Sequence, residues 1–493
     1  MGKLAGDTAW YTLGNLIPKI SNFLLLPLYS AFLSPEDYGI ISAMLTVQMV
    51  MLPICTLALD RGLERLFFDS DDPKIRRTVV GTLNLLMLGW AALVLIASVL
   101  RRDYLRMVFP GIPFFPYYAI MLGVLGLDML TITPKVYWRV TRQVKRFVFV
   151  SFLQFAVLLA MKLVFIVALR RGATGFMIAN LLAAALLTPF FAWESLRLTT
   201  FRVDFGRIRE ALAFSVPMVP LLLSGWIINL TSRMFIDRNV NMTALGIYSF
   251  AMTLASAFQM IGVSFLPAYG PVFYEIANSG DRSSLGKLFE YNRGYMLFIM
   301  FLGFCQALFM RDVLLCLNQR YLECWKYIPI MTLGIFFNLL GGVYNLCFYQ
   351  AKKSTLVMIL FFGSAALNIF LTWLLIARYG VWGCVWAGAL SSAILFAVTY
   401  LFAHRYFFVP LDFKMFGLIG GIAAAINAAF YFLELNLVPD FFGKLVCCML
   451  IALFLLRWKG EIFSAFLPAF VTRSAAWKRF YDLITYAPWK KAI

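Results

Sequence analysis

The chain has 493 residues, of which 62% are hydrophobic and only 14% are charged, and its formal net charge is +19. Soluble domains contain about 25% charged residues, so this composition excludes a soluble protein and indicates an integral membrane protein. The positive charge does not indicate nucleic-acid binding, which needs basic residues gathered on one folded face. Here they are spread through short segments between long apolar stretches.

The apolar stretches predict about fourteen transmembrane helices, each near the roughly 20 residues that cross a bilayer. The expected spans are 8–33, 38–62, 78–100, 115–138, 147–169, 172–196, 211–236, 243–267, 291–311, 327–350, 355–377, 381–403, 415–434 and 442–457. Lys and Arg are denser in every second connection and in the tail. By the positive-inside rule, we predict that both termini are cytoplasmic and that the connection 34–37 lies outside.

The first expected span carries a polar face. Its polar residues recur at helical spacing: Thr12, Asn15, Lys19, Asn22 and Tyr29. This spacing places them on one side of a helix. Lys19 lies near the middle of the span, where a charge that faces lipid costs on the order of 3 kcal/mol. We predict that this face lines a solvated, substrate-binding cavity, and snorkelling of Lys19 to the interface is the alternative.

The second expected span ends, on its predicted cytoplasmic side, in the charged sequence Asp60-Arg61-Gly62-Leu63-Glu64-Arg65. Arg61 and Glu64 are spaced to form an ion pair on a helix. We predict that Arg61 belongs to the substrate-binding cavity. Its charged neighbours are predicted to form a gate: Asp60, Glu64 and Arg65. A solvated helix end without a gating role is the alternative.

A second charge lies deep in the membrane. Asp128 is near the middle of the expected span 115–138, and Lys135 and Arg139 follow it. Ionisable residues at such depth mark ion and proton pathways. Asp128 is therefore our candidate for coupling to an H⁺ or Na⁺ gradient, and a structural pair with a lysine of another span is the alternative.

The second half of the chain offers five polar candidates within its expected spans: Asn229, Arg233, Asn338, Asn345 and Asn368. Such groups can line a transport pathway or form hydrogen bonds between helices, and the sequence leaves both interpretations open. The chain has one histidine and lacks the spacing of zinc ligands, phosphate-binding loops and dinucleotide-binding glycines. We therefore expect no enzymatic activity, no metal site and no cofactor.

The chain contains an internal repeat. Gly39-Ile40-x-Ser42-x-x-x-Thr46 recurs 207 residues later as Gly246-Ile247-x-Ser249-x-x-x-Thr253, and each copy begins the second span of a set of six. This predicts an all-α fold with two six-helix lobes in a parallel repeat around a central cavity. The expected parts are an N-terminal lobe (1–200), a C-terminal lobe (201–410), two additional transmembrane helices (411–458) and a basic cytoplasmic tail (459–493).

The opening of the chain resembles that of a known family. The matching segments are Leu13-Gly14-Asn15-Leu16-Ile17-x-Lys19, Leu24-Leu25-Leu26-Pro27-Leu28-Tyr29, Leu33-Ser34-Pro35-Glu36-Asp37-Tyr38-Gly39-Ile40, Leu57-Ala58-Leu59-Asp60-Arg61-Gly62 and Arg65-Leu66-Phe67-Phe68. They are similar to the start of the Wzx-type polysaccharide flippases of the multidrug/oligosaccharidyl-lipid/polysaccharide (MOP) superfamily. Fourteen spans differ from the twelve often seen in Wzx proteins and are closer to the lipid II flippases.

The resemblance implies a flippase of the cytoplasmic (inner) membrane. It would move a polyprenyl-diphosphate-linked oligosaccharide from the cytoplasmic to the outer leaflet by alternating access, for the biosynthesis of O-antigen, capsule or exopolysaccharide. The resemblance also implies ion-gradient coupling in some members, and contacts with membrane lipids and other polysaccharide assembly proteins. A diphosphate needs a wet cationic cavity, in which Lys or Arg can form charge-assisted hydrogen bonds. Lys19 and Arg61 are the best placed cations.

Three other kinds of function stay open. A drug or lipid II exporter of the same superfamily would share the fold, although a drug/cation antiporter favours an anionic cavity and the first span carries Lys19. A membrane polysaccharide polymerase or ligase would need a large outer loop with catalytic residues, and the predicted outer loops are short. A non-transporting scaffold of an export complex would need no charges at mid-depth.

Overall fold

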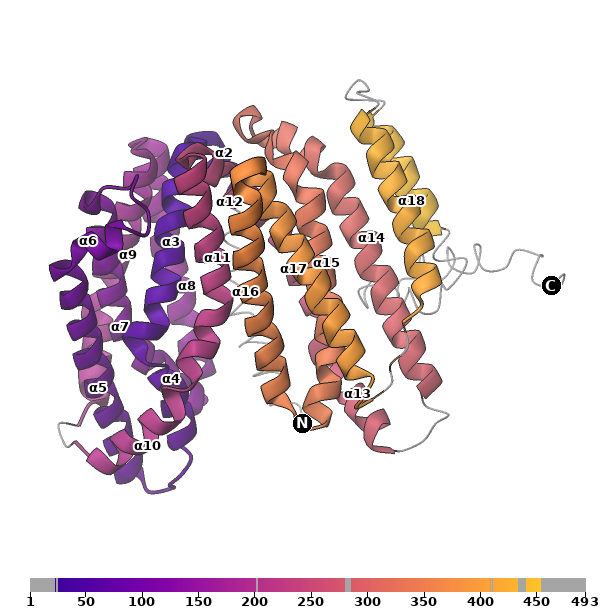
Figure 1. The fold of residues 1–493 in the computed structure, drawn as a ribbon. Coiled ribbons are helices and arrows are strands. Elements are labelled where there is room, and N and C mark those ends of the chain that lie inside the picture. The colour runs from indigo at the N-terminus through magenta and orange to yellow at the C-terminus, as the bar shows by residue number, and fades with distance from the viewer. Residues whose placement is uncertain are drawn as a thin grey trace. The chain divides into compact units, whose positions relative to one another are not determined.

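The computed structural model describes residues 23, 25–200, 203–279, 285–407, 409, 411–432 and 440–453. All regular secondary structure in this part of the chain is helical (Figure 1). The chain divides into two compact units. Unit 1 is Met1–Phe250 with Thr372–Cys384, and unit 2 is Ala251–Leu371 with Val385–Ile493.

The helices follow one another with short connections. Up to residue 263 they are α2 (Leu26–Phe32), α3 (Pro35–Thr56), α4 (Leu59–Leu66), α5 (Pro73–Leu100), α6 (Arg102–Arg106), η1 (Phe114–Tyr118), α7 (Ala119–Val140), α8 (Val144–Lys162), η2 (Leu163–Ala168), α9 (Gly172–Leu198), α10 (Phe205–Ser215), α11 (Met218–Asn239) and α12 (Met242–Val263). Then come α13 (Leu266–Ser279), α14 (Leu285–Leu317), η4 (Gln319–Tyr321), α15 (Cys324–Gln350), α16 (Ser354–Tyr379), α17 (Val381–Ala403) and α18 (Phe413–Phe432). Residues 440–453 are also helical.

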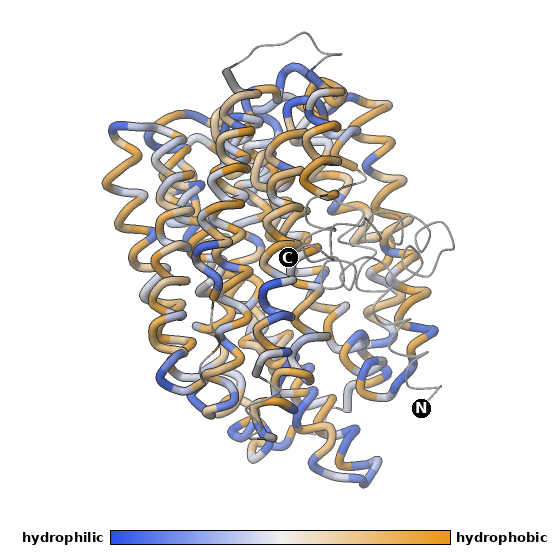
Figure 2. The backbone as a smooth tube through the Cα atoms, turned by 90° about the vertical axis from the view of Figure 1, so that its right-hand side faces the viewer, coloured by the Kyte–Doolittle hydropathy of each residue, from blue (hydrophilic) through white to orange (hydrophobic). Residues whose placement is uncertain are grey.

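Ten of the described helices, with the turns that extend them, are long and apolar enough to cross a membrane: Pro35–Thr56, Pro73–Leu100, Phe114–Val140, Val144–Ala168, Gly172–Leu198, Met242–Val263, Gly286–Leu317, Cys324–Gln350, Ser354–Tyr379 and Val381–Ala403. The middles of the helices are mainly hydrophobic, and hydrophilic residues gather near the helix ends and in the connections (Figure 2). The prediction of an all-α, multi-pass membrane protein is confirmed.

The other four expected spans correspond to α2, α11, α18 and the helical residues 440–453. Most of the first expected span falls in 1–22, which lies outside the described residues, as does 454–493 with the predicted basic tail. The predicted role of that tail therefore stays a prediction.

α3 begins with a strong helix start signal. Ser34 is the N-cap: its hydroxyl accepts a hydrogen bond from the Asp37 N–H (3.1 Å), and the Asp37 carboxylate accepts one from the Ser34 N–H (3.1 Å). This capping box, with Pro35 at the first helical position, fixes the first turn. Asp37 also accepts a hydrogen bond from the Ala173 N–H (2.8 Å) in α9. One carboxylate therefore starts a transmembrane helix and ties it to another.

The second expected span, 38–62, is divided into two helices. α3 ends at Thr56 and α4 begins at Leu59, because Leu57 and Ala58 both adopt left-handed backbone conformations (φ 50° and 54°). The Thr56 hydroxyl accepts a hydrogen bond from the Ala58 N–H (3.2 Å) and supports the turn. A left-handed conformation costs a non-glycine residue about 1–2 kcal/mol. The packing around this joint must therefore hold it in place.

The two copies of the repeated motif meet each other within unit 1. The Ser42 hydroxyl of α3 donates a hydrogen bond to the Ser249 hydroxyl of α12 (2.6 Å), and the two serines occupy the same position of the repeat. The helices approach closely at Gly39 and Gly246. A Cβ atom added to Gly246 would lie 1.7 Å from the Pro35 carbonyl oxygen. Small residues permit this kind of backbone contact between membrane helices.

A buried polar network ties α5, α7 and α9 together. The Asn84 amide donates hydrogen bonds to the hydroxyls of Ser195 (2.9 Å) and Thr199 (2.7 Å), and its oxygen accepts one from Thr133 (2.7 Å). All four residues are at most 8% exposed. Buried polar groups need such partners, and a network in which Asn84 is fully paired holds the three helices at a fixed spacing.

The predicted orientation can be tested by labelling. Glu36 is exposed at one end of α3, and Lys145 is exposed at the start of α8, in a connection rich in basic residues. With the exposed Cys316 replaced by serine, we expect a membrane-impermeant maleimide to label Glu36→Cys on intact cells and to spare Lys145→Cys, because basic connections stay in the cytoplasm. Labelling of Lys145→Cys with protection of Glu36→Cys would reverse the orientation.

Candidate functional site

α7 carries a row of charged side chains. Asp128, Lys135 and Arg139 are separated by seven and four residues, which places them on one side of the helix. Asp128 lies next to the midpoint of the apolar helix Phe114–Val140, and Lys135 is about two turns closer to the predicted cytoplasmic end. α7 packs against α3 and α4, and both helices supply partners to this row.

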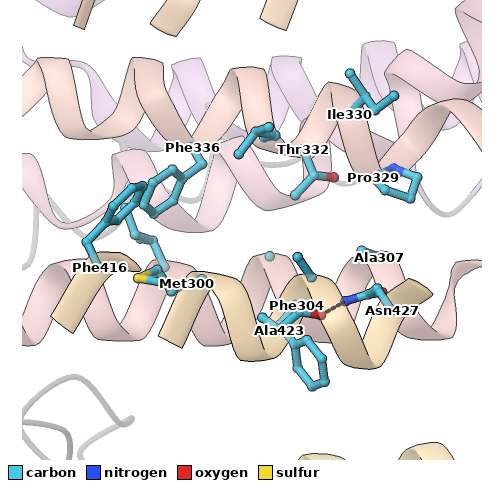
Figure 3. A pocket seen from close by; sticks show the side chains of 15 residues that line it. Met300, Phe304, Ala307, Pro329, Ile330, Thr332, Phe336, Phe416, Ala423 and Asn427 are labelled. Carbon is cyan, nitrogen blue, oxygen red and sulfur yellow. Dashed lines mark hydrogen bonds between the residues drawn. The ribbon is translucent and has the colours of Figure 1, made fainter. Parts of the chain in front are cut away.

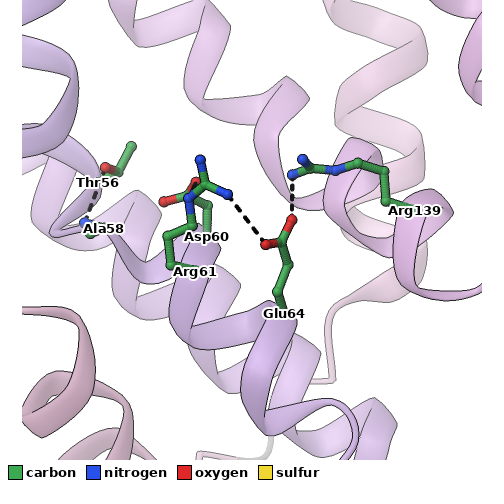
Figure 4. A network of polar contacts seen from close by, with 6 residues as sticks. All are labelled: Thr56, Ala58, Asp60, Arg61, Glu64 and Arg139. Atoms are coloured by element: carbon green, nitrogen blue, oxygen red, sulfur yellow. Dashed lines mark hydrogen bonds and ion pairs between the residues drawn. The ribbon is translucent and has the colours of Figure 1, made fainter. Parts of the chain in front are cut away.

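Ion pairs join α4 to the predicted cytoplasmic end of α7 (Figure 4). The Arg61 guanidinium lies 3.6 Å from the Asp60 carboxylate and 3.5 Å from one Glu64 oxygen, and the Arg139 guanidinium lies 2.8 Å from the other. These side chains are between 26% and 47% exposed. Ion pairs with such access to water contribute at most about 1 kcal/mol each. The connection between the two helices is therefore easily opened, which suits a gate.

Deeper in the membrane the same face has weaker contacts. Gln48 of α3 donates a hydrogen bond to the Asp128 carboxylate (3.4 Å), and Lys135 Nζ lies 5.8 Å from the centre of the Phe191 ring. Within the described part of the chain, neither Asp128 nor Lys135 has an ion pair within 4.0 Å. Charges inside a membrane are costly without water or a partner, and both side chains are partly exposed. This face therefore requires solvent or a ligand.

We call this face of unit 1 the charged strip, and its members are Gln48, Asp60, Arg61, Glu64, Asp128, Lys135 and Arg139. It brings together four of the residues predicted from the sequence: Asp60, Arg61, Glu64 and Asp128. Lys135 lies between the ion pairs of α4 and the mid-depth carboxylate. The strip can thus hold an anionic group at Lys135 and a cation at Asp128.

Arg65, the remaining predicted gate residue, contacts another helix. Its guanidinium lies 4.7 Å from the centre of the Phe214 ring on α10, a cation–π distance. α4 and α10 are close here, because a Cβ atom added to Gly62 would lie 2.4 Å from the Ser215 hydroxyl oxygen. Arg65 thus helps to dock α10 on α4, and its role in a gate stays a prediction.

Tyr29 lies in a buried contact and not on an open face. Tyr29 and Lys162 are 5% and 4% exposed, and the Lys162 ammonium donates a hydrogen bond to the Tyr29 hydroxyl (2.9 Å). The ammonium also lies 4.4 Å from the centre of the Phe176 ring. The hydroxyl and the aromatic rings supply the partial negative charge that holds a buried cation. The other predicted members of the polar face lie outside the described residues: Thr12, Asn15, Lys19 and Asn22.

Arg233 of α11 reinforces the contact between the repeat copies. Its Nε donates a hydrogen bond to the Ser42 hydroxyl (2.9 Å), and its Nη1 donates one to the Asn229 carbonyl oxygen (3.1 Å). Ser42 in turn donates to Ser249. These bonds show that Arg233 and Asn229 contribute to the packing of helices within unit 1. Their role in substrate binding stays a prediction.

Two polar candidates of unit 2 join helices. The Asn338 amide of α15 donates a hydrogen bond to the Ser392 hydroxyl of α17 (2.8 Å), and the Asn368 amide of α16 donates one to the Ser391 hydroxyl (3.0 Å). Asn345 is half-buried on α15. Hydrogen bonding between helices, one of the two interpretations that the sequence leaves open, accounts for Asn338 and Asn368.

Unit 2 contains an apolar pocket of about 350 Å³ between α14, α15 and α18 (Figure 3). Aromatic residues from these helices line it, including Phe304, Phe336 and Phe416, and among the described residues no charged side chain does. Asn427 lies at its edge and donates its amide hydrogen to the Ala423 carbonyl oxygen of its own helix (2.9 Å). The pocket can hold a hydrocarbon chain and offers no ionic partner to a phosphate.

Comparison with known proteins identifies the family. A family described as polysaccharide biosynthesis protein matches residues 30–324, which is more than half of the chain. The chain belongs to this family. No curated protein matches it.

Solved structures show the fold of this polysaccharide biosynthesis protein. It is similar to the lipid II flippase MurJ in an inward closed conformation, with a TM-score of 0.69 and 12% identity over 91% of this chain and 98% of that one. It is also similar to an inward-facing multidrug resistance MATE family transporter of the MOP superfamily, with a TM-score of 0.60 and 14% identity over 80% and 94%. The prediction that the chain has the fold of these transporters, and not that of an enzyme, is confirmed.

Three members of the charged strip in this polysaccharide biosynthesis protein are not among the site residues predicted from the sequence: Gln48, Lys135 and Arg139. The signal that could have identified Lys135 is its spacing on α7. Lys135 and Arg139 follow Asp128 at positions i+7 and i+11, which lie on one side of a helix. Gln48 is a single polar residue in an apolar stretch. No spacing rule connects it to Asp128, which is 80 residues away in the chain.

Proposed function

We propose that this protein moves a polyprenyl-diphosphate-linked oligosaccharide from the cytoplasmic to the outer leaflet by alternating access. Membership of a polysaccharide biosynthesis family supports a substrate of that biosynthesis. A lipid II flippase shares the fold, which supports a lipid-borne substrate. This function requires the cytoplasmic (inner) membrane, with the other polysaccharide assembly proteins as sources and acceptors of the substrate.

The observation that carries the proposal is the position of Lys135. It is a cation of the charged strip, inside an apolar helix, without an ion pair within 4.0 Å in the described part of the chain. A diphosphate cannot enter hydrocarbon without partners, because an uncompensated buried charge is very costly. Lys135 can form charge-assisted hydrogen bonds with the diphosphate, and the two charges then compensate each other's loss of water.

The remaining cations of the strip provide a route to Lys135. Arg61 and Arg139 lie at the predicted cytoplasmic end of unit 1, in weak, exposed ion pairs with Glu64. An arriving diphosphate can compete with Glu64 for both guanidinium groups, since Arg binds phosphate in the same forked geometry as carboxylate. Opening of these pairs would then admit the headgroup toward Lys135.

The isoprenoid chain needs an apolar environment. The pocket of unit 2, with a volume of about 350 Å³ and an aromatic lining that includes Phe304 and Phe336, can take up part of that chain. Burial of apolar surface there would add affinity of about 25 cal/mol per Å². This pocket supports a substrate that has a hydrocarbon part.

Asp128 is the proposed coupling group. A proton or Na⁺ at this carboxylate changes the net charge of the strip, and therefore the affinity of the strip for a diphosphate. Asp128→Asn keeps the size of the side chain and removes its charge, so we expect transport to lose its response to one imposed ion gradient and to slow by about tenfold. The measurement is the initial transport rate in proteoliposomes under separate pH and Na⁺ gradients.

Asp69→Asn is the matched control, because Asp69 is exposed at a helix end outside the strip. It should transport at the rate of the unaltered protein. A variant Asp128→Asn that responds normally to both gradients would remove Asp128 as the coupling group.

The function itself is tested by the location of the lipid-linked oligosaccharide in cells that lack the protein. We expect the oligosaccharide to accumulate where an impermeant glycosidase, added outside the cytoplasmic membrane, cannot reach it. Restoration of the protein should expose it. If the oligosaccharide reaches the outer leaflet without the protein and only its polymerisation or transfer fails, the protein acts as a polymerase or ligase and the proposal is wrong.

A further inference from the structure

A second polar site lies in unit 1, apart from the charged strip. It is a cavity of about 600 Å³ where α5 begins and where α7 and α9 end. Its described lining contains four arginines and one glutamate: Arg76, Arg77, Arg146, Arg197 and Glu194. These helix ends belong to the side that the positive-inside rule assigns to the cytoplasm.

Two of the arginines are fixed by the protein. Arg76 Nε donates hydrogen bonds to the carbonyl oxygens of Phe67 (3.1 Å) and Ser70 (2.6 Å). Arg146 donates to the Glu194 carboxylate (2.6 Å), and Glu194 is only 4% exposed. The cavity wall therefore has two half-buried arginines that are held by hydrogen bonds, one of them to a buried carboxylate.

The other two arginines, Arg77 and Arg197, are exposed. Neither has an ion pair within 4.0 Å in the described part of the chain. The single carboxylate of the lining is engaged by Arg146. The cavity thus carries excess positive charge and two guanidinium groups that can bind an anion in forked geometry.

The cavity is a rigid part of the fold. Val80 of α5 lines the cavity. One turn further along α5, the hydrogen bonds of Asn84 join α5 to α7 and α9. The chain after α9 also packs tightly on α5, because a Cβ atom added to Gly81 would lie 2.4 Å from the Thr200 nitrogen. A site that is already formed loses little entropy when it binds a ligand.

The cavity is separate from the charged strip. On α7 it is lined by Tyr137 and Thr141, whereas the strip uses Lys135 and Arg139. At 100° per residue, Tyr137 points about 200° away from Lys135, and Thr141 about 200° away from Arg139. The two sites therefore lie on opposite sides of one helix.

Several large apolar side chains that are near the cavity-lining residues in the sequence of α8 and α9 are exposed. Trp193 and Leu196 flank Glu194 on α9 and are 68% and 62% exposed, and Phe149, one turn after Arg146 on α8, is 67% exposed. In a membrane protein such residues face lipid, and Trp prefers the level of the headgroups. A cationic cavity at this level, beside lipid-facing apolar residues, matches an amphiphilic anion.

We propose that this cavity binds the phosphate headgroup of a resident anionic phospholipid, with Arg77 and Arg197 as its principal partners and the acyl chains against α8 and α9. Basic pockets between helices on the cytoplasmic side are suited to such headgroups. The proposal does not depend on the transport function. A headgroup held there would brace α5, α8 and α9 from outside the transport pathway.

The test is the retention of phosphatidylglycerol by the purified full-length protein in mixed nanodiscs, measured by mass spectrometry against phosphatidylcholine. We expect the double variant R77Q/R197Q to lose the preference for phosphatidylglycerol by roughly 30-fold, because each surface cation contributes to attraction of an anionic lipid. The matched control is R101Q/R102Q, which removes two exposed arginines at the opposite end of α5 and should retain the preference. R77K/R197K should keep most of it.

Three outcomes would overturn the proposal. The first is equal lipid preference in R77Q/R197Q and R101Q/R102Q. The second is saturation of the cavity by inorganic pyrophosphate alone, at the affinity found for phosphatidylglycerol, which would assign it to a soluble phosphate compound. The third is preferential retention of a polyprenyl diphosphate, which would make it a substrate entry site. Equal melting temperatures of the variants in phosphatidylcholine nanodiscs show that folding is intact.

Discussion

Lys135→Ala is expected to slow transport by roughly 10- to 100-fold, because the variant loses a charge-assisted contact to the diphosphate that is worth about 1.5–3 kcal/mol. Removal of a charge from an apolar helix eases membrane insertion, so the amount of protein should not fall. Lys135→Arg should retain part of the rate, since it keeps the charge. Lys135→Glu should be slower than Lys135→Ala, because it repels the substrate. Initial rates with a fluorescent lipid-linked oligosaccharide in proteoliposomes compare all three.

Lys145→Ala is the control for this series, because Lys145 is an exposed lysine at the same predicted side of unit 1 and outside the strip. It should leave the rate unchanged. A normal rate for Lys135→Ala would exclude Lys135 from the pathway. The sequence also predicts a phosphate contact for Lys19. If both lysines bind one diphosphate, the effects of Lys19→Ala and Lys135→Ala should not add in the double variant.

Gly246→Ala is expected to destabilise the folded protein by about 3 kcal/mol, the upper range for forced overpacking. The added Cβ atom would lie 1.7 Å from the Pro35 carbonyl oxygen, so α3 and α12 would have to separate. Gly39→Ala should act in the same way, because its Cβ atom would lie 2.3 Å from the Met242 carbonyl oxygen. The fraction of monodisperse protein that survives heating in detergent measures both effects.

Gly388→Ala provides the control in the middle of α17, where no atom lies within 4 Å of an added Cβ, and it should not lower the melting temperature. The double variant of Gly39 and Gly246 should lose less stability than the two single variants added together, because the helices need to separate only once. A variant Gly246→Ala as stable as Gly388→Ala would show that the close contact does not contribute to the folded state.

The membrane fold could be predicted because it follows from local sequence. Each crossing needs a long apolar stretch, and such stretches recur along the whole chain. Ion pairs between residues close in sequence could also be predicted. The i,i+3 spacing of Arg61 and Glu64 predicts an ion pair, and in the structure the two charged groups lie 3.5 Å apart. The capping sequence Ser34-Pro35-Glu36-Asp37 likewise marks the start of α3.

Contacts between distant residues could not be predicted in this way. Glu64 pairs with Arg139, and Lys162 binds Tyr29 across 133 residues; no periodicity connects these positions. The joint at Leu57 and Ala58 has no sequence signal either, because neither glycine nor proline occupies the two left-handed positions. There the tertiary packing overrides the helical preference of both residues.

The contact between the two repeat copies has the geometry of a symmetric dimer. The repeat offset of 207 residues relates the contacts to one another. Ser42 meets its own counterpart Ser249, and the approach of Gly39 to Met242 is equivalent to the approach of Gly246 to Pro35. Position i contacts j and j contacts i, which defines an isologous interface around a two-fold axis. A half-length ancestor with one copy of the motif could thus have formed this contact with a second molecule of itself. Fusion of two such molecules would have kept both close contacts in one chain. Each glycine would then be constrained by its own helix and by the equivalent helix of the other repeat copy.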